Sequence, residues 1–399
     1  MRMKKRIYDS ILADHVHRYR QMAFVMGPRQ VGKTTSCRLM GESYLDWDNE
    51  DHREIILAGP ASVADIAGLN KAAKKRRVLI LDEIHKYRHW KKFLKGFFDT
   101  YENDVRILVT GSSRLDVYRR GGDSLMGRYF MFRMHPFSVA ETVRTRLPES
   151  PVSPQLSPAP ADWKALLEHG GFPEPFLRRD RRFSLRWQKM RSAQLLREDI
   201  RDLTGIRDLD QLSVLVKLLG ARSGQQIIYS NLASQIRVSE NTVRSWISTL
   251  CSLQFGFLVR PWHRNITKAI RKEPKWFLRD WSSISDTGSR AETLVACHLL
   301  KAVHAWSDLG FGDFALRYIR DKQKREVDFL VVRDEKPWFL VEAKHHESAL
   351  GENLAFFQKM TGAAHAFQVV LEEDFVDTDC FGYKRPVAVP ARTFLSQLI

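Results

Sequence analysis

The chain has 399 residues, of which 44% are hydrophobic, enough for about two to four packed domains. It carries 64 Lys and Arg against 47 Asp and Glu, a net charge of +17. This surplus favours a polyanionic partner, nucleic acid before membrane, although a solvated basic surface without a partner is the alternative. The four cysteines have no C-x-x-C spacing, which excludes a cysteine zinc site, and no apolar run is long enough for a signal peptide or a transmembrane helix. We therefore expect a soluble cytoplasmic protein.

A proline-rich stretch divides the chain. Before it, strand-like apolar runs alternate with amphipathic helical stretches, as in a parallel α/β sheet. The stretch itself, RLPESPVSPQLSPAPAD, holds five prolines and predicts a flexible linker or insertion. A mostly helical stretch, basic hairpin-like segments and a last α/β block follow. The expected domains are residues 1–145, 146–162, 163–215, 216–284 and 285–399.

The sequence GPRQVGKTT fits the phosphate-binding pattern G-x-x-x-x-G-K-[ST] at each fixed position. The apolar run MAFVM before it predicts a buried strand, and the residues after it can open a helix. Glycines let backbone N–H groups surround a phosphate, the lysine reaches the β- and γ-phosphates, and the first threonine can hold Mg²⁺. This predicts an ATP site with bound Mg²⁺ whose residues are Gly27, Gly32, Lys33, Thr34 and Thr35.

A second motif, RRVLILDEIHK, strengthens this prediction. Its apolar run predicts a buried strand that ends in Asp82 and Glu83. Asp82 would then be a second protein ligand of the metal, and Glu83 could polarise the attacking water. Together the two motifs predict nucleotide binding and hydrolysis.

Two further positions follow predicted strands. The strand in VRILVTGSSRLD ends near Ser112, which could contact the γ-phosphate or equally cap the next helix. Arg128 directly precedes another strand, where it could reach the nucleotide of a neighbouring subunit or be a plain surface arginine.

The order of these motifs, followed by HPFSVAE and GGFPEP, resembles AAA+-type ATPases of bacteria and archaea. The resemblance covers nearly the whole chain apart from the proline-rich stretch. It implies an AAA+ core, a helical lid, a winged helix and a C-terminal domain of unknown function. It also implies that Arg128 lies where the trans-acting arginine finger is expected, and hence a possible homo-oligomer.

The sequence YSNLASQIRVSENTVRSWISTLCSL has the rhythm of a helix-turn-helix. Its second helix would turn Asn241 and Arg244 outward, towards a DNA groove. The basic segment after it suits a winged-helix hairpin, in which Arg264 and Lys268 would contact DNA phosphates. Docking of a protein partner is the alternative. Residues that resemble the family's usual wing are Asn265, Lys268, Pro274, Lys275 and Asp280.

The last block predicts a helix over residues 287–303, three strands, another helix and a strand. This order resembles the PD-(D/E)xK, restriction-endonuclease-like nucleases, and the resemblance places their catalytic string on Asp328, Glu342 and Lys344, with Glu292 as the helix acid. The carboxylates would hold Mg²⁺, with Mn²⁺ as a possible substitute, and the lysine would orient water or neutralise phosphate.

The alternative is that these side chains form an ion pair in a domain used only for binding, since acids in such apolar strands need a partner, either metal or lysine. Two functions follow. One is an ATPase that binds DNA and carries a metal-dependent nuclease. The other is a nucleotide-dependent switch that binds DNA or protein through an inert nuclease fold.

Overall fold

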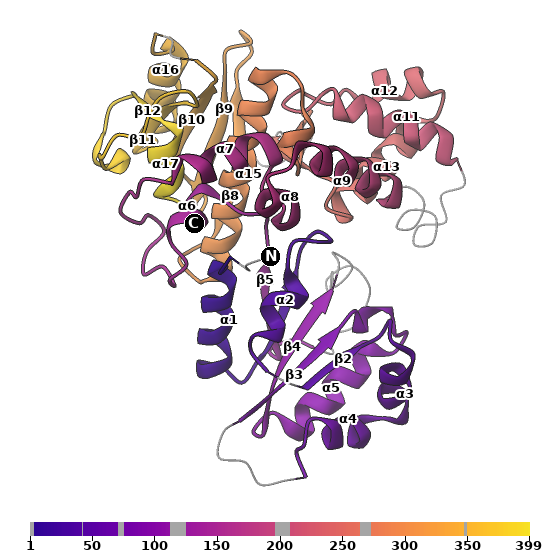
Figure 1. Cartoon of the computed structure of the whole chain (residues 1–399). Coiled ribbons are helices and arrows are strands. Elements are labelled where there is room, and N and C mark those ends of the chain that lie inside the picture. The colour runs from indigo at the N-terminus through magenta and orange to yellow at the C-terminus, as the bar shows by residue number, and fades with distance from the viewer. Residues whose placement is uncertain are drawn as a thin grey trace. The chain divides into compact units, whose positions relative to one another are not determined.

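Figure 1 shows a computed structural model of the chain, which describes residues 4–41, 43–70, 76–111, 125–195, 208–263, 273–346 and 349–399. The chain forms two compact units. One consists of Met1–Pro136 with Thr145–Leu147, and the other of Phe137–Arg144 with Pro148–Ile399. No helix among the described residues has the length and apolar character needed to cross a bilayer.

The first unit is built on a parallel five-stranded sheet with the order β2-β3-β4-β1-β5. All five residues of β1 and all seven of β4 are buried, as expected for strands covered on both faces. The strands are β1 Met22–Met26, β2 Ser43–Asp46, β3 Arg77–Asp82, β4 Val105–Gly111 and β5 Tyr129–Arg133. Since all of them run in one direction, their carboxyl ends meet at one edge, where ligands bind in such sheets.

Helices of the first unit bury one face each. In α5, Trp90–Tyr101, the apolar residues Phe93, Leu94, Phe97 and Phe98 recur at helical spacing and join the core under the sheet. The helix α2 begins at the predicted phosphate-binding lysine. The other helices are α1 Ile7–Arg18, α2 Lys33–Arg38, α3 Glu50–Ala58, α4 Pro60–Ile66 and the short 3₁₀ turn η1 Ile84–Lys86.

The second unit begins with helices. They are α6 Val139–Val143, α7 Pro160–His169, α8 Pro173–Arg178, α9 Arg181–Gln194, α11 Leu209–Gly220, α12 Tyr229–Ile236 and α13 Glu240–Ser252. The structure confirms the predicted spacing of α12 and α13. The apolar positions of both helices are buried, and the Ser239 side chain accepts a hydrogen bond from the backbone N–H of Thr242, as an N-cap does.

A seven-stranded sheet completes the second unit, with the order β12-β11-β10-β9-β8-β6-β7. The predicted order of helix, three strands, helix and strand is confirmed as α15, β8, β9, β10, α16 and β11. The strands are β6 Gly256–Pro261, β7 Lys275–Leu278, β8 Phe314–Arg320, β9 Glu326–Arg333, β10 Lys336–Lys344, β11 His365–Val370 and β12 Val387–Pro390; the helices are α15 Thr287–Asp308, α16 Glu352–Thr361 and α17 Ala391–Ser396, with the 3₁₀ turns η3 Trp281–Ser283 and η4 Cys380–Gly382.

The sheet crosses residue 284, where we expected a domain boundary. The ribbon of β6 and β7 is antiparallel, and β6 also pairs in parallel with β8, with Arg260 opposite Arg317 and Pro261 opposite Tyr318. The strand after the helix pair is therefore continuous with the last α/β block.

The sequence predicted a flexible linker or insertion for residues 146–162. In the structure residues 153–159 form neither helix nor strand, and residues 160–162 begin α7. Two hydrogen bonds tie the stretch to the C-terminal residues of the chain. Ser153 donates its backbone N–H to the carbonyl of Gln397, and Leu156 donates its own to Oγ of Ser396. Proline has no backbone N–H and fixes φ near about −65°, so it suits chain without helix or strand and also the first turn of a helix, where Pro160 lies.

Candidate functional site

The predicted phosphate-binding loop leaves the carboxyl end of β1, between β4 and β5. Gly27, Gln30 and Gly32 all have positive φ, at 156°, 61° and 101°. A Cβ on Gly27 would lie 2.2 Å from the carbonyl oxygen of Met134, so only glycine is accommodated there. Arg6 holds the same loop from outside, since its guanidinium donates to the carbonyls of Val31 and His135, each at 2.7 Å. Arg6 was not predicted from the sequence.

Lys33 lies folded against this loop. Its ammonium donates to the carbonyl oxygens of Gly27, at 3.0 Å, and Pro28, at 2.9 Å, and the residue is 8% exposed. Burial lowers the pKa of Lys33 to about 8, although the nearby carboxylates of Glu83 and Asp82 act in the opposite direction. A phosphate could replace the two carbonyls as the partner of this amine.

Asp82 ends β3 and accepts hydrogen bonds from three hydroxyl groups. Thr34 and Tyr44 donate to its Oδ2 at 2.7 Å and 2.8 Å, and Thr110 donates to its Oδ1. The parallel register brings these residues together, because Asp82 pairs with Thr110 and with Asp46 at the ends of neighbouring strands. Hydroxyl and carboxylate oxygens are ligands that Mg²⁺ accepts alongside water and phosphate, so Thr34 and Asp82 fit the predicted metal. Tyr44 was not predicted to be a site residue, because the only sequence signal at this position is a short apolar run.

The remaining predicted residues of the first unit lie in different surroundings. Glu83 has φ of 52°, and burial raises the pKa of its carboxyl. Thr35 is exposed on α2, and Ser112 lies outside the described residues. Arg128 forms a two-point ion pair with Asp99, from Nε to Oδ1 at 2.6 Å and from Nη2 to Oδ2 at 3.0 Å. Reaching a neighbouring subunit would require Arg128 to leave Asp99.

On the predicted DNA-reading helix, Asn241 and Arg244 are exposed. Arg244 pairs with Glu240 one turn earlier, at 3.0 Å from Nε, and its guanidinium lies 3.9 Å from the centre of the Tyr229 ring. Arg264 and Lys268 lie outside the described residues.

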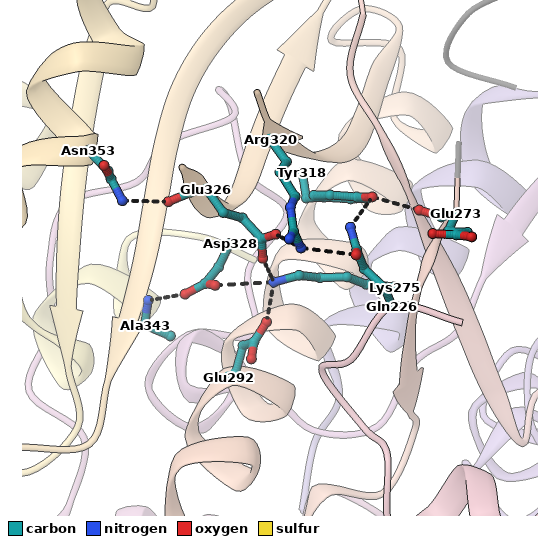
Figure 2. Close-up of polar contacts among 10 residues, drawn as sticks. All are labelled: Gln226, Glu273, Lys275, Glu292, Tyr318, Arg320, Glu326, Asp328, Ala343 and Asn353. Atoms are coloured by element: carbon teal, nitrogen blue, oxygen red, sulfur yellow. Dashed lines mark hydrogen bonds and ion pairs between the residues drawn. The ribbon is translucent and has the colours of Figure 1, made fainter. Parts of the chain in front are cut away.

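A buried lysine stands among the predicted nuclease acids. Figure 2 shows the ammonium of Lys275, from β7, in contact with Glu326 at 2.6 Å, Glu292 at 2.9 Å and Asp328 at 3.2 Å. We call these four residues the lysine–acid cluster. Lys275 is 3% exposed. Burial alone would lower its pKa, but the charges of Asp328, Glu292 and Glu326 outweigh it and raise the pKa above the ordinary range.

Further hydrogen bonds hold the cluster in place. Asp328 accepts from the backbone N–H of Ala343 at 3.0 Å, and Arg320 contacts Glu326 at 3.2 Å and the side-chain oxygen of Gln226 at 2.9 Å (Figure 2). Burial raises the pKa of Glu292, the helix acid, and the charge of Asp328 acts in the same direction. The cluster thus joins β7, α15, β9 and β10 through charge-assisted hydrogen bonds.

Glu342 and Lys344 pair with each other instead, at 2.7 Å. Burial alone would lower the pKa of Lys344, yet the hydrogen bond to Glu342 raises it. The other oxygen of Glu342 is buried and has no hydrogen-bond partner among the described residues, and it faces the position where Gly351 lacks a side chain.

Of the predicted nuclease residues, Glu292 and Asp328 thus contact the ammonium of Lys275, and Glu342 pairs with Lys344. Within the described part of the chain, one group of three His, Cys, Asp or Glu side chains has ligand atoms close enough to share a metal, and it consists of His345, His346 and Glu372. Strand pairing brings the positive charge of Lys275 to these acids from β7. From the sequence this lysine was expected in the wing, at the start of the run KWFL, and not beside the predicted nuclease acids.

Comparison with known proteins identifies families for two parts of the chain. Residues 19–143 match a family described as AAA domain, and residues 160–287 match a domain of unknown function, DUF8612. The uncharacterised protein Rv2008c of Mycobacterium tuberculosis is 24% identical over 329 residues, which cover 79% of this chain and 69% of that protein. The uncharacterised protein MJ1637 of Methanocaldococcus jannaschii is 24% identical over 313 residues, covering 68% and 64%.

Similar solved structures are distant. The Aeropyrum pernix Orc1 protein, solved in complex with DNA, has a TM-score of 0.32 and 14% identity, over 72% of this chain and 91% of that one. The Bacillus subtilis DNA clamp loader delta protein has a TM-score of 0.29 and 10% identity, over 62% and 87%. At such scores the likeness says nothing of what this chain binds. The family match agrees with the loop geometry, and residues 19–143 have the features of an AAA domain with a phosphate-binding loop.

Proposed function

We propose that the protein binds ATP with Mg²⁺ and hydrolyses it at the carboxyl edge of the five-stranded sheet. The observation that carries this proposal is the joint position of Lys33, Thr34 and Asp82, where the hydroxyl of Thr34 meets the carboxylate of Asp82 at 2.7 Å. Backbone N–H groups of the loop and the start of α2 would bind the phosphates. Mg²⁺, held by Thr34 and Asp82, would supply charge neutralisation on the transferred phosphoryl group.

The side chains around this position have roles that follow from their surroundings. The ammonium of Lys33 can exchange its two carbonyl partners for phosphate oxygens. Glu83 directly follows Asp82, and its raised pKa makes it a better proton acceptor from water than an ordinary surface glutamate. Tyr44 and Thr110 orient the carboxylate of Asp82.

Steady-state hydrolysis of ATP tests this proposal. Lys33→Ala should abolish ATP binding, whereas Glu83→Gln should retain binding and lose most hydrolysis, on the order of 10²-fold or more. Lys336→Ala, a change on an exposed strand end of the second unit, serves as the control. Undiminished hydrolysis in Lys33→Ala would contradict the proposal.

The second unit is proposed to bind DNA through the exposed face of α13. Support comes from the net charge of +17 and from the N-terminal turns of α13, where Asn241 and Arg244 are exposed. Replacement of Arg244 by Ala should weaken binding to duplex DNA and make it less sensitive to salt. The charge-neutral control on the same helix is Ser248→Ala, which is also exposed.

The lysine–acid cluster supports the view that the nuclease-like fold serves binding rather than cleavage. An ammonium within 3.2 Å of three carboxylates already balances much of their charge. Under this proposal nucleotide turnover controls engagement of DNA or of a protein partner.

Metal-dependent cleavage of DNA is the second candidate function. One observation favours it, namely the buried oxygen of Glu342 beside Lys344. Incubation of supercoiled and linear DNA with Mg²⁺ or Mn²⁺, with and without ATP, separates the two functions. Cleavage that is lost in Lys344→Ala and in Glu342→Gln would establish the nuclease. Absence of cleavage in a preparation that hydrolyses ATP would leave the binding function.

A further inference from the structure

Two adjacent histidines and a glutamate meet where β10 and β11 end. Nδ1 of His345 lies 3.1 Å from Nε2 of His346 and 3.4 Å from Oε1 of Glu372. Nδ1 of His346 lies 2.5 Å from Oε2 of Glu372. One potential ligand atom from each of the three side chains falls within 4.8 Å of the others.

The backbone sets the positions of these residues. The strands β10 and β11 are parallel, with Lys344 opposite Val370 as their last pair. Two backbone hydrogen bonds follow this pair just beyond the strands: Leu371 donates its N–H to the carbonyl of Lys344 at 3.0 Å, and Glu372 donates its N–H to the carbonyl of His345 at 3.2 Å. The second of these bonds holds the backbones of His345 and Glu372 together.

The group differs in charge from the lysine–acid cluster. That cluster contains its own cation, Lys275. In the described part of the chain the carboxylate of Glu372 instead meets two imidazoles and no lysine or arginine. Two neutral imidazoles and one carboxylate leave a net negative donor set that an external cation can neutralise.

We propose that His345, His346 and Glu372 bind a transition-metal ion of the Zn²⁺ class. Imidazole nitrogen suits Zn²⁺, Cu²⁺ and Ni²⁺, whereas Mg²⁺ prefers oxygen ligands. Three protein ligands leave one position of a tetrahedral ion open to water, and the exposure of His346 and Glu372 gives solvent access to that position. The bound ion links the ends of two neighbouring strands. None of the three residues belongs to the proposed ATP site or to the predicted nuclease residues.

Titration of the whole, tag-free protein with Co²⁺ and then Zn²⁺, without nucleotide, tests the proposal. The wild type should bind about one equivalent of Co²⁺ with visible absorption bands of a low-coordinate site, and Zn²⁺ should displace it. Saturating Zn²⁺ should also raise the unfolding temperature, since a ligand that binds only the folded state stabilises it.

Variants assign the site. His346→Ala and Glu372→Gln should lose both the absorption bands and the Zn²⁺-dependent thermal shift. His17→Ala removes an exposed histidine of α1 in the first unit and should keep both. The absence of saturable binding to the wild type would overturn the proposal, and so would binding that survives in both ligand variants. Glu372→Gln retains the size of the side chain on an exposed position, so its unfolding transition without metal should match that of the wild type.

Discussion

Asp82 receives its three hydroxyl partners from different parts of the first unit, Thr34 from α2, Tyr44 from β2 and Thr110 from β4. The carboxylate is 6% exposed, and these protein hydroxyl groups orient it. An acid held in this way loses little rotational freedom when it takes part in a metal site, which favours tight and well-directed binding. The hydroxyl of Tyr44 is the partner that can be removed with the least change in shape.

We expect Tyr44→Phe to raise the Mg²⁺ concentration needed for half-maximal ATP hydrolysis by about tenfold, because a hydrogen bond to a charged group contributes about 1.5–3 kcal/mol. Affinity for ATP in the absence of Mg²⁺ should change little, since Tyr44 contacts Asp82 and not the loop. Tyr19→Phe is the control, on an exposed tyrosine elsewhere in the unit. A Mg²⁺ dependence equal to that of the wild type would show that Tyr44 does not position Asp82.

The pH dependence of ATP binding follows from Lys33. Its pKa in the free protein is lowered to about 8 by burial, so the ammonium loses its proton as the pH rises through that value. Bound phosphate favours the charged form, so binding takes up a proton above about pH 8 and affinity falls by up to about tenfold per pH unit there. Below about pH 7 Lys33 is already charged and contributes no slope.

Calorimetric titrations with ATP between about pH 6.5 and pH 9.5 measure both the affinity and the proton uptake. Lys33→Arg, if it binds ATP, should lack this slope because a guanidinium stays charged throughout the range. An affinity of the wild type that stays constant up to pH 9.5 would contradict this assignment.

At the scale of elements, the lysine–acid cluster connects the ribbon of β6 and β7 to the rest of the sheet. Lys275 opens β7, Glu292 lies on α15, and Glu326 and Asp328 lie on β9. Such a cluster contributes little net stability compared with apolar packing, but removing one partner leaves the others buried and uncompensated. The cluster therefore makes the position of β7 depend on Lys275.

We expect Lys275→Met to lower the free energy of unfolding by about 3–5 kcal/mol, measured by denaturation in urea. Lys336→Met, on an exposed end of β10, should change it by about 0.5 kcal/mol or less. In Lys275→Met, Mg²⁺ or Mn²⁺ should recover part of the loss, because Glu292, Glu326 and Asp328 then lack a cation. A loss below about 1 kcal/mol would mean that these charges are solvated and unpaired in solution.

At the scale of the whole molecule, the ATPase match and the compact units do not end at the same residue. The match extends to residue 143, whereas Phe137–Arg144 belong to the second unit. Within that unit, Glu141 of α6 forms an ion pair with Lys301 of α15, and both side chains are almost completely buried. Ser138 also donates its hydroxyl to the backbone carbonyl of Ile399. The last helix of the ATPase match thus folds as part of the C-terminal unit.

We expect Glu141→Gln to destabilise the second unit by about 3–5 kcal/mol and to leave the first unit unchanged, because Lys301 would keep a buried charge without this carboxylate. Hydrogen exchange of backbone amides can follow the two units separately. In the variant we expect exchange to become faster in α6 and α15 and to stay at the wild-type rate in β1 and β4. The double variant Glu141→Leu with Lys301→Met should be less destabilised than either single change. A stability loss in the double variant that equals the loss of a single variant, or the sum of the two single losses, would contradict a direct ion pair between Glu141 and Lys301.

Local sequence patterns were enough to predict the phosphate-binding loop, the strand that ends in Asp82 and the helix pair with Ser239 as its N-cap. They also predicted the order of helices and strands in the last block. Each of these depends on spacing within a few residues, on the positive φ of glycine or on burial of one face, and all of them are short-range properties. The sequence also singled out the acidic residues Glu292, Asp328 and Glu342 as candidate site residues.

Tertiary structure alone decided which charges meet. Lys275 reaches Glu292 and Asp328 because β6 pairs with β8, a contact between strands more than fifty residues apart in the chain. Arg6 at the phosphate loop, Tyr44 at Asp82, and Glu372 beside His345 were likewise brought in by packing and strand register. The free energy of a buried charge depends on the partner within a few ångströms, and that partner is chosen by the three-dimensional fold rather than by neighbours in sequence.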